Sequence, residues 1–219
     1  MLVSDLFSLT LAFLYVAALI GIAETLRRVF HVPRDVTRKI VHVGVGMTAL
    51  AVTFIFRDWT IAIIGPLTFI VVNYFSYRRN LFRGIETGET GQLGTVYFPL
   101  SFVLLTPLLW SRPALLAAAF MPMAWGDAAA AILGKRLGAH QFSLFGQVSS
   151  VEGSIAMFVL SLIATNLVLV LFGQPVDSSV LAAFLTASVA TLLEALSPWG
   201  LDNLTVPIVS AFVLSILIK

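Results

Sequence analysis

Residues 114–133 read ALLAAAFMPMAWGDAAAAIL, and Asp127 is the single charged residue in this run. About 20 apolar residues in a helix span the hydrocarbon core of a bilayer, which is about 30 Å thick. The run therefore predicts a transmembrane helix that places one carboxylate inside the membrane.

The composition of the whole chain favours the same solvent. Of 219 residues, 59% are hydrophobic and 11% are charged, whereas soluble domains have roughly 25% charged residues. A chain with so little charge cannot cover a water-exposed surface, which excludes a soluble globular protein. The absence of cysteine excludes disulfides and thiolate metal sites.

Seven further stretches approach the length of a span. We expect a polytopic, all-α integral membrane helical bundle of seven or eight transmembrane helices, forming a single domain over residues 1–219. The expected spans are residues 5–26, 40–56, 59–76, 96–110, 114–133, 152–173, 178–196 and 203–218. The stretches 40–56 and 203–218 are also compatible with re-entrant or broken helices. Residues 1–26 lack the basic segment and the cleavage site of a signal peptide, so we expect a retained helix there.

Basic residues lie mainly in alternate loops. Ten of the 13 Lys and Arg residues follow the first, third and fifth expected spans: Arg27, Arg28, Arg34, Arg38, Lys39, Arg78, Arg79, Arg83, Lys135 and Arg136. The positive-inside rule places these loops in the cytoplasm. Most carboxylates lie near the same side, so we expect a cytoplasmic active face that binds a charged, water-soluble substrate.

The start of the second expected span carries residues suited to anions. Arg38 and His42 are one helical turn apart and share a face. Arg38 and Lys39 are suited to phosphate oxygens, and His42 is suited to a hydrogen bond with substrate or to a role as a base. The two cations are equally typical of residues that anchor a helix at the membrane interface.

A glycine-rich segment precedes the fourth expected span and ends in Gly94 and Thr95. Glycines let backbone N–H groups approach an anion closely, and Thr95 lies near the start of a helix, where anions are favoured. The segment lacks the Gly-Lys-Ser/Thr ending of a P-loop. A phosphate cradle and a flexible turn both fit these residues.

Asp127 requires a partner. A carboxylate buried among alanines costs several kcal/mol unless it is paired or bound to a cation. A structural ion pair and a metal site would both satisfy it. Lys135 and Arg136 follow near the end of the same helix, where they either bind phosphate or mark the cytoplasmic end of the span.

Two later motifs add carboxylates. Glu152-Gly153-Ser154 opens the sixth expected span, for which Ser150 is the expected N-cap. Glu194 precedes Asp202-Asn203, where two polar residues enter the last span side by side. Mg²⁺ prefers hard oxygen donors and takes one or two carboxylates together with substrate phosphates. The expected metal ligands for Mg²⁺ are Asp127, Glu152, Glu194 and Asp202.

Five short motifs follow one another along residues 34–210. They are Arg38-Lys-Ile-Val-His42, Gly94-Thr-Val-Tyr-Phe-Pro99, Gly126-Asp127 with Gly134 and Gly138, Ser150-Val-Glu-Gly-Ser154, and Asp202-Asn-Leu-Thr-Val-Pro207. Each motif is short, but the five in this order are fairly specific. The pattern resembles the phytol kinase and dolichol kinase family of polyprenol kinases. Ser149 stands where such kinases commonly carry lysine.

The resemblance implies Mg²⁺-dependent transfer of the terminal phosphate of a nucleotide, usually CTP, to a long isoprenoid alcohol from the bilayer, with no nucleic acid as a partner. Together with the residues themselves, it predicts catalytic roles for Asp127, Asp202, Glu152 and His42. The predicted nucleotide and phosphate contacts are Arg38, Lys39, Gly94, Thr95, Lys135, Arg136, Gly153, Ser154 and Asn203.

Two other functions remain open on the sequence. The chain is similar, more distantly, to phosphatidate cytidylyltransferases. A membrane transporter would also place charges within spans, but it is expected to show paired broken helices in two related halves, and this sequence has no such halves.

Overall fold

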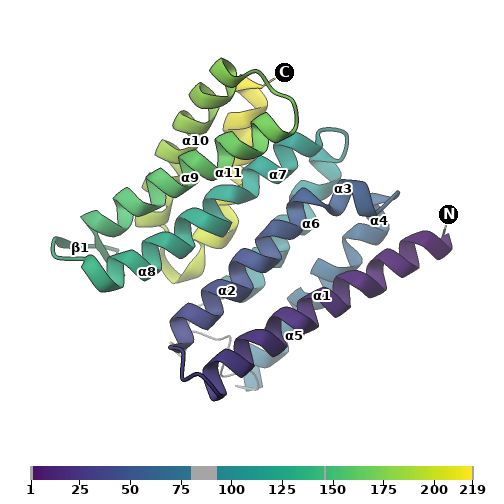
Figure 1. The fold of residues 1–219 in the computed structure, drawn as a ribbon, viewed down its shortest axis with the longest axis horizontal. Helices are drawn as coiled ribbons and strands as arrows, with labels where there is room; N and C mark the ends of the chain where they lie inside the picture. The colour runs from purple at the N-terminus through teal and green to yellow at the C-terminus, as the bar shows by residue number, and fades with distance from the viewer. Residues whose placement is uncertain (1, 80–92, 146, 219) are drawn as a thin grey trace.

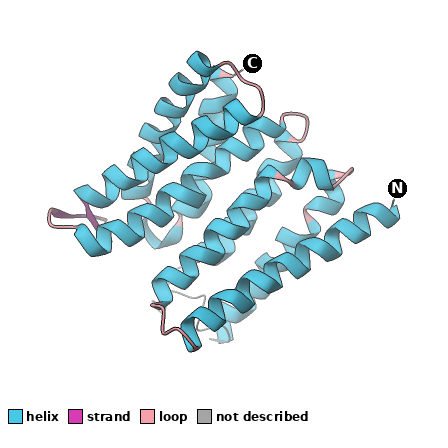
Figure 2. Cartoon of the chain, in the orientation of Figure 1, coloured by secondary structure: helices cyan, strands magenta, loops and turns pink. Residues whose placement is uncertain are grey.

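The computed structural model describes residues 2–79, 93–145 and 147–218, which are almost entirely helical (Figures 1 and 2). The expected all-α class is confirmed. In chain order the helices are α1 (Leu2–Arg28), α2 (Arg34–Gly46), η1 (Met47–Leu50), α3 (Val52–Ile55), α4 (Trp59–Ala62), α5 (Ile64–Arg79), α6 (Gly94–Leu109), α7 (Pro113–Met121), η2 (Pro122–Gly126), α8 (Asp127–Leu137), α9 (Val151–Leu171), α10 (Val176–Leu196), η3 (Pro198–Gly200) and α11 (Asp202–Leu217). The strands β1 (Gln141–Leu144) and β2 (Gln147–Ser150) form an antiparallel hairpin between α8 and α9.

Five helical stretches among the described residues are long and apolar enough to cross a membrane. They are Ser4–Arg28, Trp59–Arg79, Pro113–Leu137, Val151–Leu171 and Val176–Leu196. Two shorter apolar helices, α6 and α11, occupy the expected fourth and eighth spans. A helical membrane bundle is therefore confirmed, whereas the count of seven or eight complete crossings stays a prediction.

The expected second span is a broken helix. It begins at Arg34, and its α-helical part ends at Gly46, where a turn of 3₁₀-helix leads into the short α3. A Cβ atom on Gly46 would lie 2.6 Å from Ala124 Cβ, so glycine is needed where α2 approaches η2. The last expected span is not broken, because α11 continues through Pro207.

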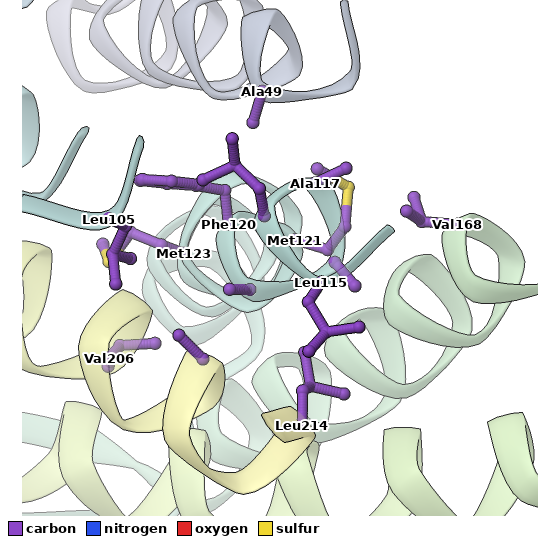
Figure 3. Packing of buried hydrophobic residues seen from close by; sticks show 14 of the residues in the cluster. Ala49, Leu105, Leu115, Ala117, Phe120, Met121, Met123, Val168, Val206 and Leu214 are labelled. Carbon is purple, nitrogen blue, oxygen red and sulfur yellow. The ribbon is translucent and has the colours of Figure 1, made fainter. Parts of the chain in front are cut away.

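The stretch α7–η2–α8 is the central element of the bundle. Of its most apolar 18 residues, 78% are buried inside the protein. The corresponding share for α1, which lies at the periphery, is 17%. Phe120, Met121 and Met123 are almost completely inaccessible to solvent (Figure 3). Around this core α9 packs against α8 and α10, and α11 packs against α10, α7 and α6.

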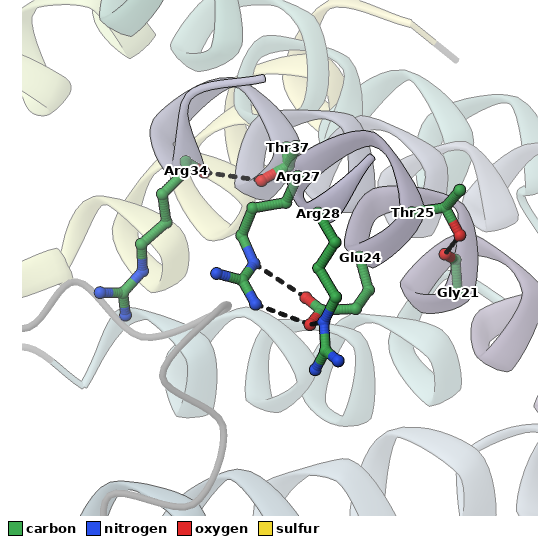
Figure 4. A network of polar contacts seen from close by, with 7 residues as sticks. All are labelled: Gly21, Glu24, Thr25, Arg27, Arg28, Arg34 and Thr37. Atoms are coloured by element: carbon green, nitrogen blue, oxygen red, sulfur yellow. Dashed lines mark hydrogen bonds and ion pairs between the residues drawn. The ribbon is translucent and has the colours of Figure 1, made fainter. Parts of the chain in front are cut away.

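Helices α1, α2, α5 and α6 form the other side of the molecule. α1 packs against α2, and α5 packs against α6 (Figure 1). At the α1–α2 turn, Arg27 and Arg28 both donate to the carboxylate of Glu24, and Thr37 Oγ1 donates to Arg34 O at 3.0 Å (Figure 4). This basic turn lies at the same end of the bundle as the β-hairpin (Figure 1).

The central helix contains one turn of π-helix, η2, directly before Asp127. At its last residue, Gly126, an added Cβ would lie 2.1 Å from Ser161 Oγ, 2.7 Å from Met157 Sδ and 3.0 Å from Met157 O. α9 therefore packs directly on the backbone of η2, and only glycine allows this approach.

We predict that Gly126→Ala destabilises the protein while Gly21→Ala does not. Both changes raise helix propensity by about 0.5–1 kcal/mol, but no atom lies within 4 Å of a Cβ at Gly21. Overpacking at Gly126 is expected to cost about 1–3 kcal/mol. Thermal unfolding in detergent checks this prediction, and equal melting temperatures for the two variants would contradict it.

Candidate active site

A buried ion pair joins α2 to the central helix. Lys39 Nζ donates to Asp127 Oδ2, and the exposed fractions of the two residues are 8% and 6%. An attraction between opposite charges is stronger in a buried place than at the surface, because less water screens it. Of the two alternatives left open for Asp127, an ion pair or a metal site, the structure shows an ion pair with Lys39, and Lys39 is not merely an interfacial anchor.

His42 lies one turn further along α2 and supports the same region. Its Nε2 atom lies 3.0 Å from Met123 O and 3.5 Å from Asp127 Oδ2. A carbonyl oxygen can only accept, so Nε2 donates to it. The imidazole ring also packs on Phe98, with ring centroids 4.2 Å apart. While this hydrogen bond holds, Nε2 cannot accept a proton from a substrate.

A tight turn between α10 and α11 brings two predicted motifs together. Trp199 and Gly200 have positive φ angles of 58° and 80°, which glycine adopts without strain and other residues rarely adopt. A Cβ on Gly200 would lie 2.7 Å from both Gly94 N and Gly94 Cα. Asn203 Nδ2 donates to Gly200 O at 3.2 Å. The start of α6 and the start of α11 are therefore in close contact.

One cavity of about 1230 Å³ unites these elements. One part of its wall is polar and is formed by Arg38, Lys39, His42, Asn73, Tyr77, Arg78, Gly94, Thr95, Asp127, Gln147, Glu194, Asp202 and Asn203. The rest of the wall is mainly apolar and comes from α1, η1, α3, α5 and α6. Nine of the predicted site residues share this cavity: Arg38, Lys39, His42, Gly94, Thr95, Asp127, Glu194, Asp202 and Asn203.

The other predicted residues lie in a second cluster, near the hairpin, and do not line the cavity. Ser150 Oγ caps α9 by accepting from Gly153 N at 3.1 Å, which confirms the expected N-cap. Glu152 accepts a hydrogen bond from His140 Nδ1 at 2.7 Å. Gly153 packs against Gly134 of α8. The remaining members of this group are Ser154, Lys135 and Arg136.

Lys135 also connects this cluster to α2. Its Nζ donates to Asp35 Oδ2, and this cation holds the pKa of the Asp35 carboxyl below its usual value. The pair is largely exposed, so it contributes little stability. It shows that the end of α8 and the start of α2 are neighbours.

A comparison with curated proteins finds a phytol kinase from Synechocystis sp. that is 36% identical over 208 residues. The match covers 93% of this chain and 88% of that protein. The chain belongs to the phytol kinase family. No family model and no solved structure matches the chain.

Within this member of the phytol kinase family, four residues of the polar wall were not predicted from the sequence: Asn73, Tyr77, Arg78 and Gln147. Asn73 Nδ2 donates to Thr95 O at 2.7 Å and so ties α5 to the start of α6. An asparagine inside an apolar span, with Tyr77 one turn later, is a signal that could have revealed these two residues. The other glycines of the glycine-rich segment are Gly84, Gly88 and Gly91. They lie outside the described residues, as does Arg83.

The carboxylates in the cavity suit a hard cation. Asp127, Glu194 and Asp202 all line this cavity. Among the described residues no three His, Asp or Glu side chains form a closed metal-binding group. Mg²⁺ does not need one, because it usually keeps water and binds substrate phosphates besides one or two carboxylates.

We predict that Lys39→Met unfolds at a markedly lower temperature than wild type. Removing one partner of a buried ion pair leaves an uncompensated charge and costs about 3–5 kcal/mol. The double variant Lys39→Met/Asp127→Leu is expected to recover most of that loss, because neither charge of the pair is left without its partner. Melting temperatures of wild type, the single variant and the double variant in detergent test both expectations. A single variant as stable as wild type would show that the pair contributes nothing to folding.

Proposed function

We propose that this protein is a prenyl-alcohol kinase that transfers the terminal phosphate of CTP to the hydroxyl of an isoprenoid alcohol such as phytol, with Mg²⁺ and at the cytoplasmic face. Membership of the phytol kinase family supports a kinase that acts on such alcohols. The observation that carries the proposal is the single cavity, in which buried charged residues meet a long apolar wall.

The polar part of the cavity has the groups that phosphoryl transfer requires. This reaction depends mainly on positioning and on stabilising negative charge. Arg38, Lys39 and Arg78 line the polar wall and would bind the phosphates of the nucleotide. Asp127 and Asp202 would hold Mg²⁺, which when bound neutralises charge on the transferred phosphoryl group.

We assign Glu194 as the group that accepts the proton of the alcohol hydroxyl. Its side chain lines the cavity and has no hydrogen-bond partner in the part of the chain that the structure describes, whereas Asp127 is already held by Lys39. The alcohol oxygen forms a bond to the terminal phosphorus as the bond from that phosphorus to the bridging oxygen breaks. The hydroxyl proton passes to the Glu194 carboxylate, and CDP leaves.

Labelled nucleotides distinguish this reaction from that of a cytidylyltransferase. With purified protein, phytol and Mg²⁺, label from the γ-phosphate of CTP is expected in the lipid product, and label from the α-phosphate is not. With phosphatidate in place of phytol, transfer of α-label to the lipid with release of pyrophosphate would instead indicate a cytidylyltransferase. Parallel assays with ATP, GTP and UTP test the choice of CTP, and omission of Mg²⁺ tests the metal.

We predict that Asp127→Asn and Asp202→Asn each lower turnover by on the order of 10³-fold, because each loses charge stabilisation worth several kcal/mol in the transition state. Asp58→Asn is the matched control, since Asp58 caps α4 by accepting from Thr60 N at 2.9 Å and does not line the cavity. Each variant is first checked for membrane insertion and for its melting temperature, because Asp127→Asn also removes one partner of the buried ion pair. Near-normal turnover in a correctly inserted Asp127→Asn or Asp202→Asn variant would remove that residue from the chemistry.

We predict the sidedness of the site from cysteine labelling. The chain has no cysteine, so His31→Cys, Ala139→Cys and Asp177→Cys each carry one thiol at an exposed position. The positive-inside rule places the first two in the cytoplasm and the third outside. Labelling of intact cells with an impermeant maleimide is expected to modify the Asp177→Cys variant alone. Modification of His31→Cys and Ala139→Cys instead would invert the orientation.

A further inference from the structure

The apolar part of the cavity follows one face of α1. Ser8, Ala12, Val16 and Ile20 all line it, and residues four apart lie on the same face of a helix. The adjacent Ala18 is exposed on another face and does not line the cavity. α1 therefore contributes a continuous row of residues to the cavity wall, although it is peripheral to the bundle.

The opposite wall gives the length of this space. It runs from Lys39 through Val45 and Val52 to Ile55, all of which line the cavity. The α-helical part of this wall, from Lys39 to Gly46, rises roughly 10 Å at 1.5 Å per residue. The 3₁₀ turn η1 and the short α3 continue the wall to Ile55. The cavity thus extends from the buried ion pair along the whole of this broken helix.

At the far end of the cavity α1 contacts the end of α3. Ser8 Oγ donates to Ile55 O at 2.9 Å, and Arg57 N donates to Asp5 Oδ1 at 2.9 Å. Phe56, which lies between these two contacts in sequence, is buried and lines the cavity. These residues form a floor at the end remote from Lys39.

Two aromatic rings meet between the floor and the ion pair. Phe13 of α1 and Phe69 of α5 have ring centroids 5.9 Å apart, and both line the cavity. Tyr15 Oη donates to Gly44 O at 3.0 Å, so Tyr15 of α1 lies beside Gly44 of α2. Phe13 precedes Tyr15 on α1 and therefore lies nearer to Ser8 and further from Lys39. The two rings thus line the cavity part-way along its length.

We propose that the apolar part of the cavity holds the hydrocarbon tail of the alcohol along α1, and that the space between the ion pair and Phe56 selects tail length. This inference rests on the proposed kinase function. An amphiphile whose hydroxyl lies beside Lys39 and Asp127 can extend its tail along this apolar part of the cavity. Ala12 on one wall and Phe56 at the floor are then specificity-determining residues.

A matched pair of substitutions on α1 tests the tail site. Ala12→Phe fills the cavity, whereas Ala18→Phe adds the same ring to the same helix outside it. The substrates are geraniol, farnesol and geranylgeraniol, which differ by one isoprene unit each, presented in mixed micelles with saturating CTP. The readout is the ratio of kcat/KM for geranylgeraniol to that for geraniol, which does not depend on how much of each preparation is folded.

Ala12→Phe is expected to lower this ratio at least tenfold, because apolar pockets discriminate by about tenfold or more for small changes in size. Ala18→Phe is expected to leave it unchanged, and Phe56→Ala is expected to improve the use of alcohols longer than geranylgeraniol. The KM for CTP should be the same in all four proteins.

The outcomes separate the two proposals. If wild type phosphorylates none of the alcohols, the proposed function fails. If it phosphorylates them but Ala12→Phe and Ala18→Phe give the same ratio as wild type, the tail does not lie in this cavity, and the space holds another molecule such as a bilayer lipid. An equal loss of activity on all alcohols in Ala12→Phe would also overturn the tail site.

Discussion

The ion pair between Lys39 and Asp127 is the contact on which the arrangement of the site depends. It joins the start of α2, on the loosely buried side of the molecule, to the central helix, which is the most deeply buried element. Neither charge would be tolerated there alone, since an isolated charge in an apolar interior costs several kcal/mol. The pair therefore fixes how α2 crosses the central helix. The close contact of Gly46 with Ala124 and the bond from His42 to Met123 O follow along the same interface.

The π-helical turn before Asp127 connects this pair to the packing of the bundle. Such turns are rare in proteins and occur often at functional sites. Here the turn ends at Gly126, whose lack of a side chain lets α9 pack against it. The turn also carries Met123, whose carbonyl oxygen His42 binds. The position of Asp127 thus depends on contacts on two sides of the central helix, from α2 and from α9.

The sequence predicted the helical class and the apolar segments because lipid imposes a simple requirement of length and hydrophobicity. It also singled out Asp127, because a lone carboxylate among alanines needs a partner. It could not identify Lys39 as that partner, since this depends on the crossing of two helices far apart in the chain. Nor could it separate Glu152 from the carboxylates of the cavity. Glu152 begins α9 beside His140, which the fold of the hairpin decides. The close contact of Gly200 with Gly94 could not be predicted from the sequence either, because it arises from a turn with positive φ angles.

The two parts of the cavity contribute differently to recognition of a lipid substrate. In a bilayer the tail of an alcohol is already in an apolar solvent, so moving it into an apolar cavity gains little from the hydrophobic effect; the same argument limits association between transmembrane helices. Capture of the alcohol must then come mainly from its hydroxyl and from the charged groups near Lys39, Asp127 and Glu194. In the proposed tail site the apolar wall would act instead by exclusion. A tail longer than the space between the ion pair and Phe56 would have to displace packed side chains. A well-packed interior resists such displacement. A peripheral helix such as α1 can therefore determine which alcohol is used while contributing few of the groups that bind it.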